Sequence, residues 1–249
     1  MCRFTGKLYN SSSETTIKLI YGGSAYLMNI DSYNNRIIKL WYDYKEEKNL
    51  ELSPLLYPEP EQKCILFIGL NPATDPKDIS SYELYKFDNI KNNKGKIIEH
   101  FRDNVSKLTW MKYFHDYLEQ MNWGWAYIDL FYYREPKQNT LKTVIFNNKK
   151  LNKFACAQLK ITEHIIRDIK PRAVIVVNAD ATKIIRGEKG YKFNNIRIED
   201  FNEDYGTYIM KIDSVKCPAF FTGAMSTDKE TLIRLAWHIK YVLRKNHKT

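Results

Sequence analysis

Short apolar runs alternate with longer amphipathic stretches along most of the chain. Four of the runs have the length and composition of strands that are covered on both faces: residues 64–69, 125–131, 173–178 and 218–222. Strands that alternate with helices are typical of a parallel sheet between two layers of helices. The pattern therefore predicts the α/β class, as a three-layer αβα sandwich with a four-stranded, mostly parallel sheet.

Helical spacing of apolar residues marks three stretches: 94–121, 148–169 and the segment after residue 228. The first can be two helices, because Thr109 is a suitable N-cap for a second one. Ser226 or Thr227 is the expected cap of the last helix. Its inward face is expected to hold Leu232, Leu235, Ala236, Ile239, Tyr241, Val242 and Leu243.

Two further stretches have a mixed pattern. Residues 75–93 form a polar segment with aromatic residues, which predicts a functional loop or a partly helical one. Residues 193–212 indicate a hairpin. We treat residues 1–249 as a single domain, in which residues 1–60 are an N-terminal extension packed on the rest.

The N-terminal extension contains two apolar runs and a proline-rich connector. The run at 15–21 is either a strand or the start of a helix, and a second run spans 36–42. Prolines at 54, 58 and 60 predict an exposed connector into the first main strand. No run reaches the ~18 apolar residues of a membrane span, and the first residues lack the apolar core of a signal peptide. We therefore expect a cytoplasmic protein without a membrane partner.

Composition adds a preference for polyanions. The chain has 39 Lys and Arg against 29 Asp and Glu, a net charge of +10, and 18 tyrosines. Such a balance favours contact with nucleic acid, although a solvated lysine surface gives the same count. The cysteines at 2, 64, 156 and 217 are far apart and form no C-x-x-C pair. This spacing predicts reduced thiols and no metal site.

The strongest candidate for chemistry is the turn after the first main strand. Gly69-Leu-Asn-Pro72 follows five apolar residues, and ligands of open α/β sheets bind beyond the carboxyl ends of the strands. An amide side chain and an open loop backbone at this point indicate a site. An ordinary Asn-Pro turn after a strand is the alternative.

The same turn resembles the first motif of the uracil-DNA glycosylase superfamily, especially its mismatch-specific branch with a Gly-x-Asn-Pro signature. Ile128-Asp129 is similar to the strand that supplies base recognition there, and residues 170–177 resemble the third strand. Phe221-Thr-Gly-Ala-Met-Ser226 stands where the superfamily has its second motif. The resemblance covers about residues 60–245.

The resemblance implies a DNA glycosylase that cleaves the N-glycosidic bond of a flipped, damaged or deaminated base. It implies single-stranded or lesion-containing duplex DNA as partner and neither a cofactor nor a metal. We expect a monomeric protein. A catalytically inactive nucleic-acid-binding protein on the same fold is the main alternative. An α/β enzyme acting on nucleotides is a third possibility, without a phosphate-binding glycine pattern to support it.

The resemblance also implies roles for the residues around the turn. Asn71 would hold the attacking water, and the backbone around Leu70 would contact the base. Asp75 is a candidate to assist the water, or a turn residue bonded to its own backbone. Aromatic side chains would stack on the flipped base, or only pack the loop; the candidates are Tyr82, Tyr85 and Phe87.

Two departures from the superfamily affect these roles. Asp129 stands where several branches use Asn to read uracil, and an ionised carboxylate only accepts hydrogen bonds. It suits N3–H of uracil but repels O4 unless it is protonated; a capped strand end is the alternative. The second motif lacks His and Pro, which leaves backbone groups and side chains for binding phosphate: Gly223, Ala224, Ser226 and, after the second strand, Arg134. For Arg134, an exposed salt bridge is the alternative.

Overall fold

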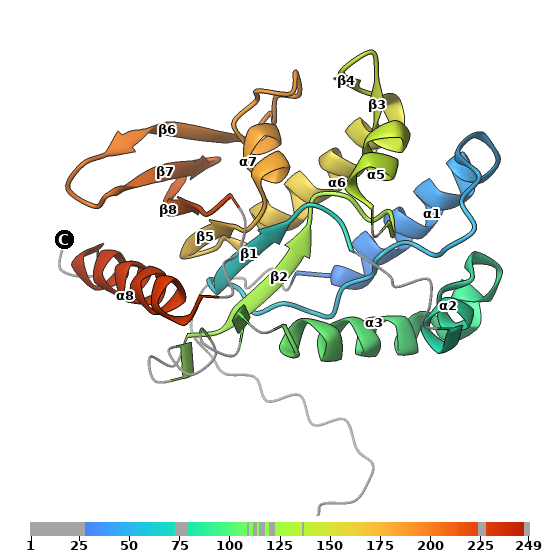
Figure 1. The fold of residues 1–249 in the computed structure, drawn as a ribbon, viewed down its shortest axis with the longest axis horizontal. Helices are drawn as coiled ribbons and strands as arrows, with labels where there is room; N and C mark the ends of the chain where they lie inside the picture. The colour runs from blue at the N-terminus through green and yellow to red at the C-terminus, as the bar shows by residue number, and fades with distance from the viewer. Residues whose placement is uncertain are drawn as a thin grey trace, which may run out of the picture.

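The computed structural model describes residues 28–72, 79–108, 110–111, 114, 118–119, 123–135, 137–223 and 228–246. Within them the protein is an α/β fold around one sheet (Figure 1). The sheet order is β2-β1-β5-β8-β7-β6. Its strands are β1 Ile65–Gly69, β2 Trp125–Asp129, β5 Ala173–Val176, β6 Ile196–Asn202, β7 Thr207–Ile212 and β8 Val215–Phe221.

The predicted parallel strands are confirmed as β1, β2, β5 and β8, but the sheet has six strands rather than four. The hairpin expected at 193–212 is formed by β6 and β7, and β7 pairs antiparallel with β8. Asp213, with φ +52°, lies in the turn that brings Ile212 opposite Val215. So short a connection forces the hairpin to extend the sheet beside β8.

The centre of the sheet is buried on both faces. Leu66 and Ile68 of β1 belong to a core cluster with residues of α1 and α6. Ile65 and Phe67 belong to a second cluster with residues of α8. Side chains alternate across a strand, so an unbroken apolar run is what two covered faces require. In Figure 1, α6 and α7 lie on one side of β1 and β5, and α8 lies on the other.

The helices account for the amphipathic stretches. They are α1 Ile30–Lys48, α2 Ile79–Tyr85, the 3-10 helix η1 Phe87–Asn89, α3 Ile90–Ser106, α5 Gln138–Ile145, α6 Lys153–Ile169, α7 Ala179–Ile185 and α8 Lys229–Asn246. A short hairpin, β3 Phe146–Asn147 with β4 Lys150–Leu151, precedes α6. The described part of the predicted segment 75–93 is therefore largely helical. The predicted helix 94–121 is divided, because α3 ends at Ser106 and Trp110 is helical again.

Two predictions about α8 need correction. The side chain of Asp228 accepts a hydrogen bond from the Thr231 amide at 2.8 Å and so caps the first turn. The predicted caps, Ser226 and Thr227, lie outside the described residues. Tyr241, predicted to be buried, has 44 % of its surface exposed. Its neighbours Val242 and Leu243 fill the inward face instead, so Tyr241 lies on the boundary of the apolar stripe.

The described part of the N-terminal extension belongs to the core. The amide of Asn34 on α1 donates to Tyr57 O and its oxygen accepts from Tyr57 N, both at 2.9 Å. The connector predicted to be exposed is buried from Ser53 to Tyr57, because Leu55 and Leu56 pack into the main cluster. The run at 15–21 lies outside the described residues. Within those residues, no helix has the length and apolar character needed to cross a membrane.

Asn178 follows β5 and serves as the N-cap of α7. Its side-chain oxygen accepts from the amides of Asp180 at 2.8 Å and Ala181 at 3.1 Å. We predict that Asn178→Ala lowers the free energy of unfolding in urea by about 1 kcal/mol, because two helix N–H groups lose their partner. Asn147→Ala, at an exposed position at the end of β3, is the matched control and should leave the transition unchanged.

Candidate functional site

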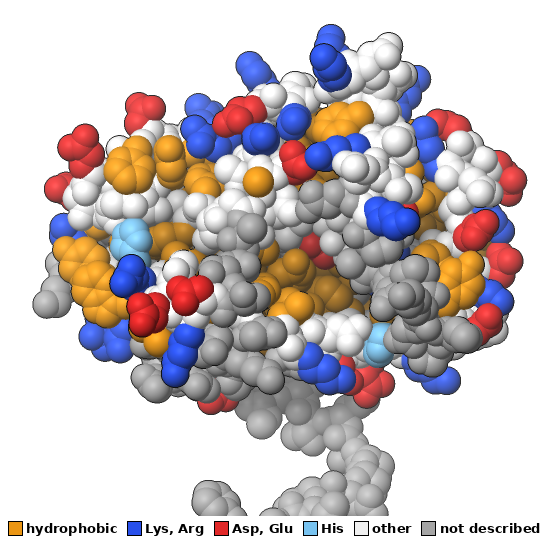
Figure 2. All heavy atoms as spheres, in the orientation of Figure 1, with side chains coloured by type: hydrophobic (Ala, Val, Ile, Leu, Met, Phe, Trp, Pro, Cys, Tyr) orange, Lys and Arg blue, Asp and Glu red, His pale blue; other side chains and the backbone are white. Residues whose placement is uncertain are grey.

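The strand order places a crevice at the carboxyl ends of β1 and β5. The chain leaves β1 toward β2 on one side, and leaves β5 toward β8 on the other. Connections that diverge in this way open a crevice where ligands of α/β sheets bind. The Gly69–Pro72 turn follows β1 at this point. Figure 2 shows hydrophobic side chains in a hollow near the middle of the face where β1 and β2 lie in Figure 1.

Asn71 is held by three backbone carbonyls. Its Nδ2 donates to Pro72 O at 3.2 Å, to Tyr133 O at 3.3 Å and to Glu135 O at 2.8 Å. The bonds to Tyr133 and Glu135 join the turn after β1 to the segment after β2, and the three bonds together fix the plane of the amide. Leu70 is buried, and its carbonyl accepts from Phe131 N at 2.9 Å. The turn is therefore rigid, and Asn71 Oδ1 is the part of the amide that these three bonds leave unused.

The carboxyl group of Asp129 lies over Gly69 at the end of β1. A Cβ atom at residue 69 would overlap both the Asp129 carboxylate and the Tyr127 hydroxyl. Tyr127 donates to Asp129 Oδ1 at 3.2 Å, and Asp129 is only 2 % exposed. Glycine is thus required here for a close approach between neighbouring strands rather than for a special backbone angle.

Burial raises the pKa of Asp129 from its ordinary 3.8 to about 7. The hydrogen bond from Tyr127 and the charge of Arg134 lower the same pKa but only partly offset the loss of hydration. The carboxyl group therefore changes between a neutral and a charged form near neutral pH. In its neutral form it both donates and accepts hydrogen bonds, as an amide does.

Arg134 is a buried cation, 6 % exposed. Its Nε donates to Ser53 O at 3.2 Å, and its guanidinium carbon lies 3.6 Å from the ring centroid of Tyr85. Burial lowers its pKa to about 10, so it stays charged at neutral pH. Its Nη2 and the hydroxyl of Ser53 have no hydrogen-bond partner among the described residues. Arg134 therefore points into the protein and does not form the exposed salt bridge that was the alternative from the sequence.

Of the three aromatic candidates, only Tyr85 has a described contact with Arg134. Tyr85 is buried beneath Arg134, and its hydroxyl contacts His100 Nδ1 at 2.5 Å. The described contacts of the other two are with different parts of the chain. Tyr82 donates to Glu51 at 3.4 Å, and the buried ring of Phe87 packs on Tyr42 with centroids 4.7 Å apart.

The segment after β8 is described as far as Gly223. Thr222 donates its hydroxyl to Val176 O at 3.1 Å, which ties the end of β8 to β5. Gly223 follows with φ +69°, a conformation that favours glycine. Ala224 and Ser226 lie outside the described residues, and so does Asp75.

Two tyrosines that contact Asp129 were not among the predicted site residues. Tyr127 precedes Asp129 by two residues on β2, so the alternation of a strand places both on one face; this signal was available. The Tyr57 hydroxyl accepts from Asp129 N at 3.0 Å and donates to Asp129 O at 3.2 Å. Tyr57 comes from the connector before β1, and no local pattern connects it with β2.

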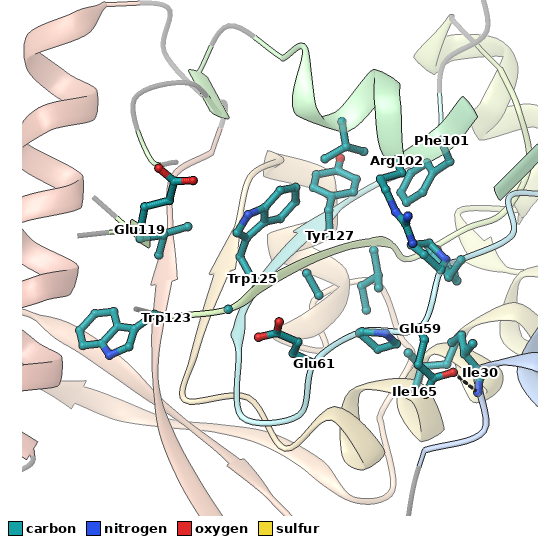
Figure 3. A pocket seen from close by; sticks show the side chains of 18 residues that line it. Ile30, Glu59, Glu61, Phe101, Arg102, Glu119, Trp123, Trp125, Tyr127 and Ile165 are labelled. Carbon is teal, nitrogen blue, oxygen red and sulfur yellow. Dashed lines mark hydrogen bonds between the residues drawn. The ribbon is translucent and has the colours of Figure 1, made fainter. Parts of the chain in front are cut away.

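A second concave region lies along the outer edge of β2. It is a cleft of about 600 Å³ whose walls are β2, α3 and the connector at 57–61. Figure 3 shows the rings of Trp125 and Tyr127 along it, with the carboxylates of Glu61 and Glu119. No group of three or more His, Cys, Asp and Glu side chains converges as a metal site within the described part of the chain.

No protein-family model matches the sequence, and no curated protein matches it.

The raised pKa of Asp129 predicts a pH-dependent stability. The folded state holds this proton more tightly than the unfolded state, so the contribution is present below pH 3.8 and is lost as the pH rises through about 7. We predict that Asp129→Asn is stabilising relative to the wild type at pH 8 but not at pH 4. The difference should grow by up to about 1.4 kcal/mol per pH unit between the two pKa values.

Urea denaturation of both proteins from pH 4 to 8 measures this difference. Asp43→Asn, on the exposed face of α1, is the matched control. A constant difference between wild type and Asp129→Asn across the range would contradict a buried titrating carboxyl group.

Proposed function

We propose that the protein is a DNA glycosylase-like enzyme that cleaves the N-glycosidic bond of a flipped, damaged or deaminated base. The observation that carries the proposal is the buried Asp129 carboxyl group beside the Gly69–Pro72 turn, with a pKa near 7. The resemblance of that turn to the uracil-DNA glycosylase superfamily supports the same activity.

Recognition of the base follows from the neutral form of Asp129. A protonated carboxyl group donates O–H to a carbonyl such as O4 of uracil and accepts N3–H with its other oxygen. It thereby reproduces the donor and acceptor pair that an asparagine offers. The charged form keeps only the acceptors, so recognition of a uracil-like edge weakens as Asp129 ionises.

Hydrolysis would use two groups whose positions are fixed by the fold, Asn71 and Arg134. Asn71, fixed through Nδ2, orients a water through Oδ1 on the sugar face of the bond. An amide is a poor general base, so turnover is slow. The buried charge of Arg134 favours negative charge nearby, and the departing base carries negative charge in the transition state.

A binding protein without catalysis is the second candidate, and one observation favours it. All three described hydrogen bonds of Asn71 stabilise the fold, which gives the residue a structural role without chemistry. Binding of a flipped base by Asp129 and its neighbours does not require a positioned water.

We predict excision from oligonucleotides that carry uracil, hypoxanthine, xanthine or a mismatch, measured as strand cleavage after alkaline treatment of abasic sites. The activity should fall as the pH rises above about 7, because Asp129 ionises there. Asp129→Asn should keep its activity at pH 8, and Asn71→Ala should lose at least ~100-fold, the range of a positioned catalytic group.

The circular dichroism and melting temperature of Asn71→Ala must first show that it folds, since the variant loses three structural bonds. Unchanged excision in folded Asn71→Ala would remove Asn71 from the mechanism. Binding of the same oligonucleotides without excision of any base would favour the second candidate.

An aromatic pair on α8 gives the proposal a described surface for DNA. Trp237 and Tyr241 are 61 % and 44 % exposed, and their rings stack with centroids 5.5 Å apart at 12°. Lys245 Nζ lies 6.0 Å from the Tyr241 centroid, and the exposed Arg244 precedes it. Figure 2 shows hydrophobic side chains with neighbouring basic ones over α8. Exposed rings beside cations are typical of surfaces that stack bases and contact phosphates.

We predict that Trp237→Ala weakens binding of a fluorescent dT20 oligonucleotide about 5- to 100-fold, the range for one stacked base. Tyr42→Ala, which removes an aromatic side chain 48 % exposed on α1, is the matched control and should bind like wild type. Affinity should fall steeply between ~50 and ~200 mM salt. Salt-independent affinity would contradict phosphate contacts, and equal loss in both variants would contradict a specific role for α8.

A further inference from the structure

The two edges of the sheet are built differently. The edge strand β6 has a bulge between Ile198 and Phe201 and carries the charged residues Arg197, Glu199 and Asp200. Bulges and charges of this kind prevent another strand from pairing. The other edge strand, β2, pairs with β1 in regular register and reads Trp125-Ala-Tyr-Ile before Asp129. It has neither a bulge nor a proline.

Alternate backbone groups of β2 face the cleft rather than β1. Ile65 N donates to Gly124 O at 2.9 Å, and Leu130 N donates to Gly69 O at 3.1 Å. Backbone groups along a strand alternate in direction, so those of Trp125, Tyr127 and Asp129 face away from β1. The hydroxyl of Tyr57 accepts from the backbone N–H of Asp129 and donates to its backbone carbonyl. Among the described residues, Trp125 and Tyr127 have no such partner on that side.

The cleft that borders this edge is acidic and aromatic, although the whole chain is strongly basic. Its charged lining residues are Glu59, Glu61, Glu119 and Arg102. Glu59 already accepts from the Ile30 amide at 3.2 Å, whereas Glu61 projects along β2 and lies close over Gly124 (Figure 3). Trp123, Trp125 and Phe101 supply apolar walls. Excess carboxylates repel a nucleic acid and attract a basic partner.

We propose that this cleft, the β2 cleft, binds an extended peptide segment in which Lys or Arg alternates with apolar residues, and that the segment adds to β2 as a further strand. Its main chain pairs with the outward groups of Trp125 and Tyr127, as in other cases of strand addition. Its apolar side chains pack on the aromatic walls, and its cations face Glu61. A small cation would leave the outward backbone groups without partners. The proposal does not rest on the glycosylase activity. The β2 cleft shares Tyr57 and Tyr127 with the surroundings of Asp129, but the groups that bind the peptide are the outward backbone of Trp125 and Tyr127 and the carboxylate of Glu61.

The test is amide hydrogen exchange of the full chain by NMR. The probe is the peptide acetyl-Thr-Lys-Val-Arg-Val-Lys-Thr-amide, added to about 1 mM, a concentration suited to weak binding. We expect the amides of Trp125 and Tyr127 to exchange at least ~10-fold more slowly with the peptide. The amides of Ala126 and Ile128, which face β1, are the internal reference and should not change.

Two altered peptides and one pair of variants separate the contributions. N-methylation of two consecutive central residues blocks both edges of the peptide and should abolish the protection. Glu in place of its three basic residues should do the same. Glu61→Gln should weaken binding about 2- to 5-fold, the range of a partly exposed ion pair. Glu47→Gln, on α1, should not.

Three results would overturn the proposal. The first is exchange of Trp125 and Tyr127 that is unaffected by the peptide. The second is protection of both amides in the free protein, which would mean that another part of this chain fills the cleft. The third is protection that increases with protein concentration, which would mean that a second copy fills it.

Discussion

The Asp129 carboxyl group occupies space over Gly69 that any larger residue at position 69 would fill. This contact joins the ends of β1 and β2 and removes a carboxyl group from water. A charge in such surroundings is costly, so the pKa of Asp129 rises to about 7 and the group is readily protonated. The tyrosines at 57 and 127 satisfy the polar groups of Asp129, and Arg134 lies close enough to lower its pKa. The chemistry proposed for the site depends on this arrangement.

The rigidity of the crevice has the same origin as the stability of the fold. Asn71 joins the turn after β1 to the segment after β2 through two carbonyls, and Thr222 joins the end of β8 to β5. The strand ends are thereby held at fixed positions around the switch point of the sheet. A site of this kind orients a ligand without rearrangement, which is an advantage when the side chains are weak catalysts.

Charge is distributed unevenly over the molecule. Lys245 and Arg244 lie at the end of α8 beside exposed rings, whereas Glu59 and Glu61 line the cleft at the β2 edge of the sheet. The net charge of +10 is a property of the whole chain and does not indicate the acidic cleft. Two surfaces of opposite character suit partners of opposite charge, which is why we propose a nucleic acid at α8 and a basic peptide at β2.

The sequence by itself determined the four parallel strands and the position of the turn at Gly69, because burial on both faces requires unbroken apolar runs. It also determined most of α6, whose apolar residues recur at helical spacing, although the helix begins at Lys153 after the Asn152 cap rather than at residue 148. The hairpin joins the sheet through the tight turn at Asp213 between β7 and β8, which the residue pattern by itself did not reveal. Tertiary structure alone decided the inward direction of Arg134 and the approach of Tyr57 to Asp129. Those depend on distances between segments remote in sequence, and the pKa of a buried group depends on all of its surroundings.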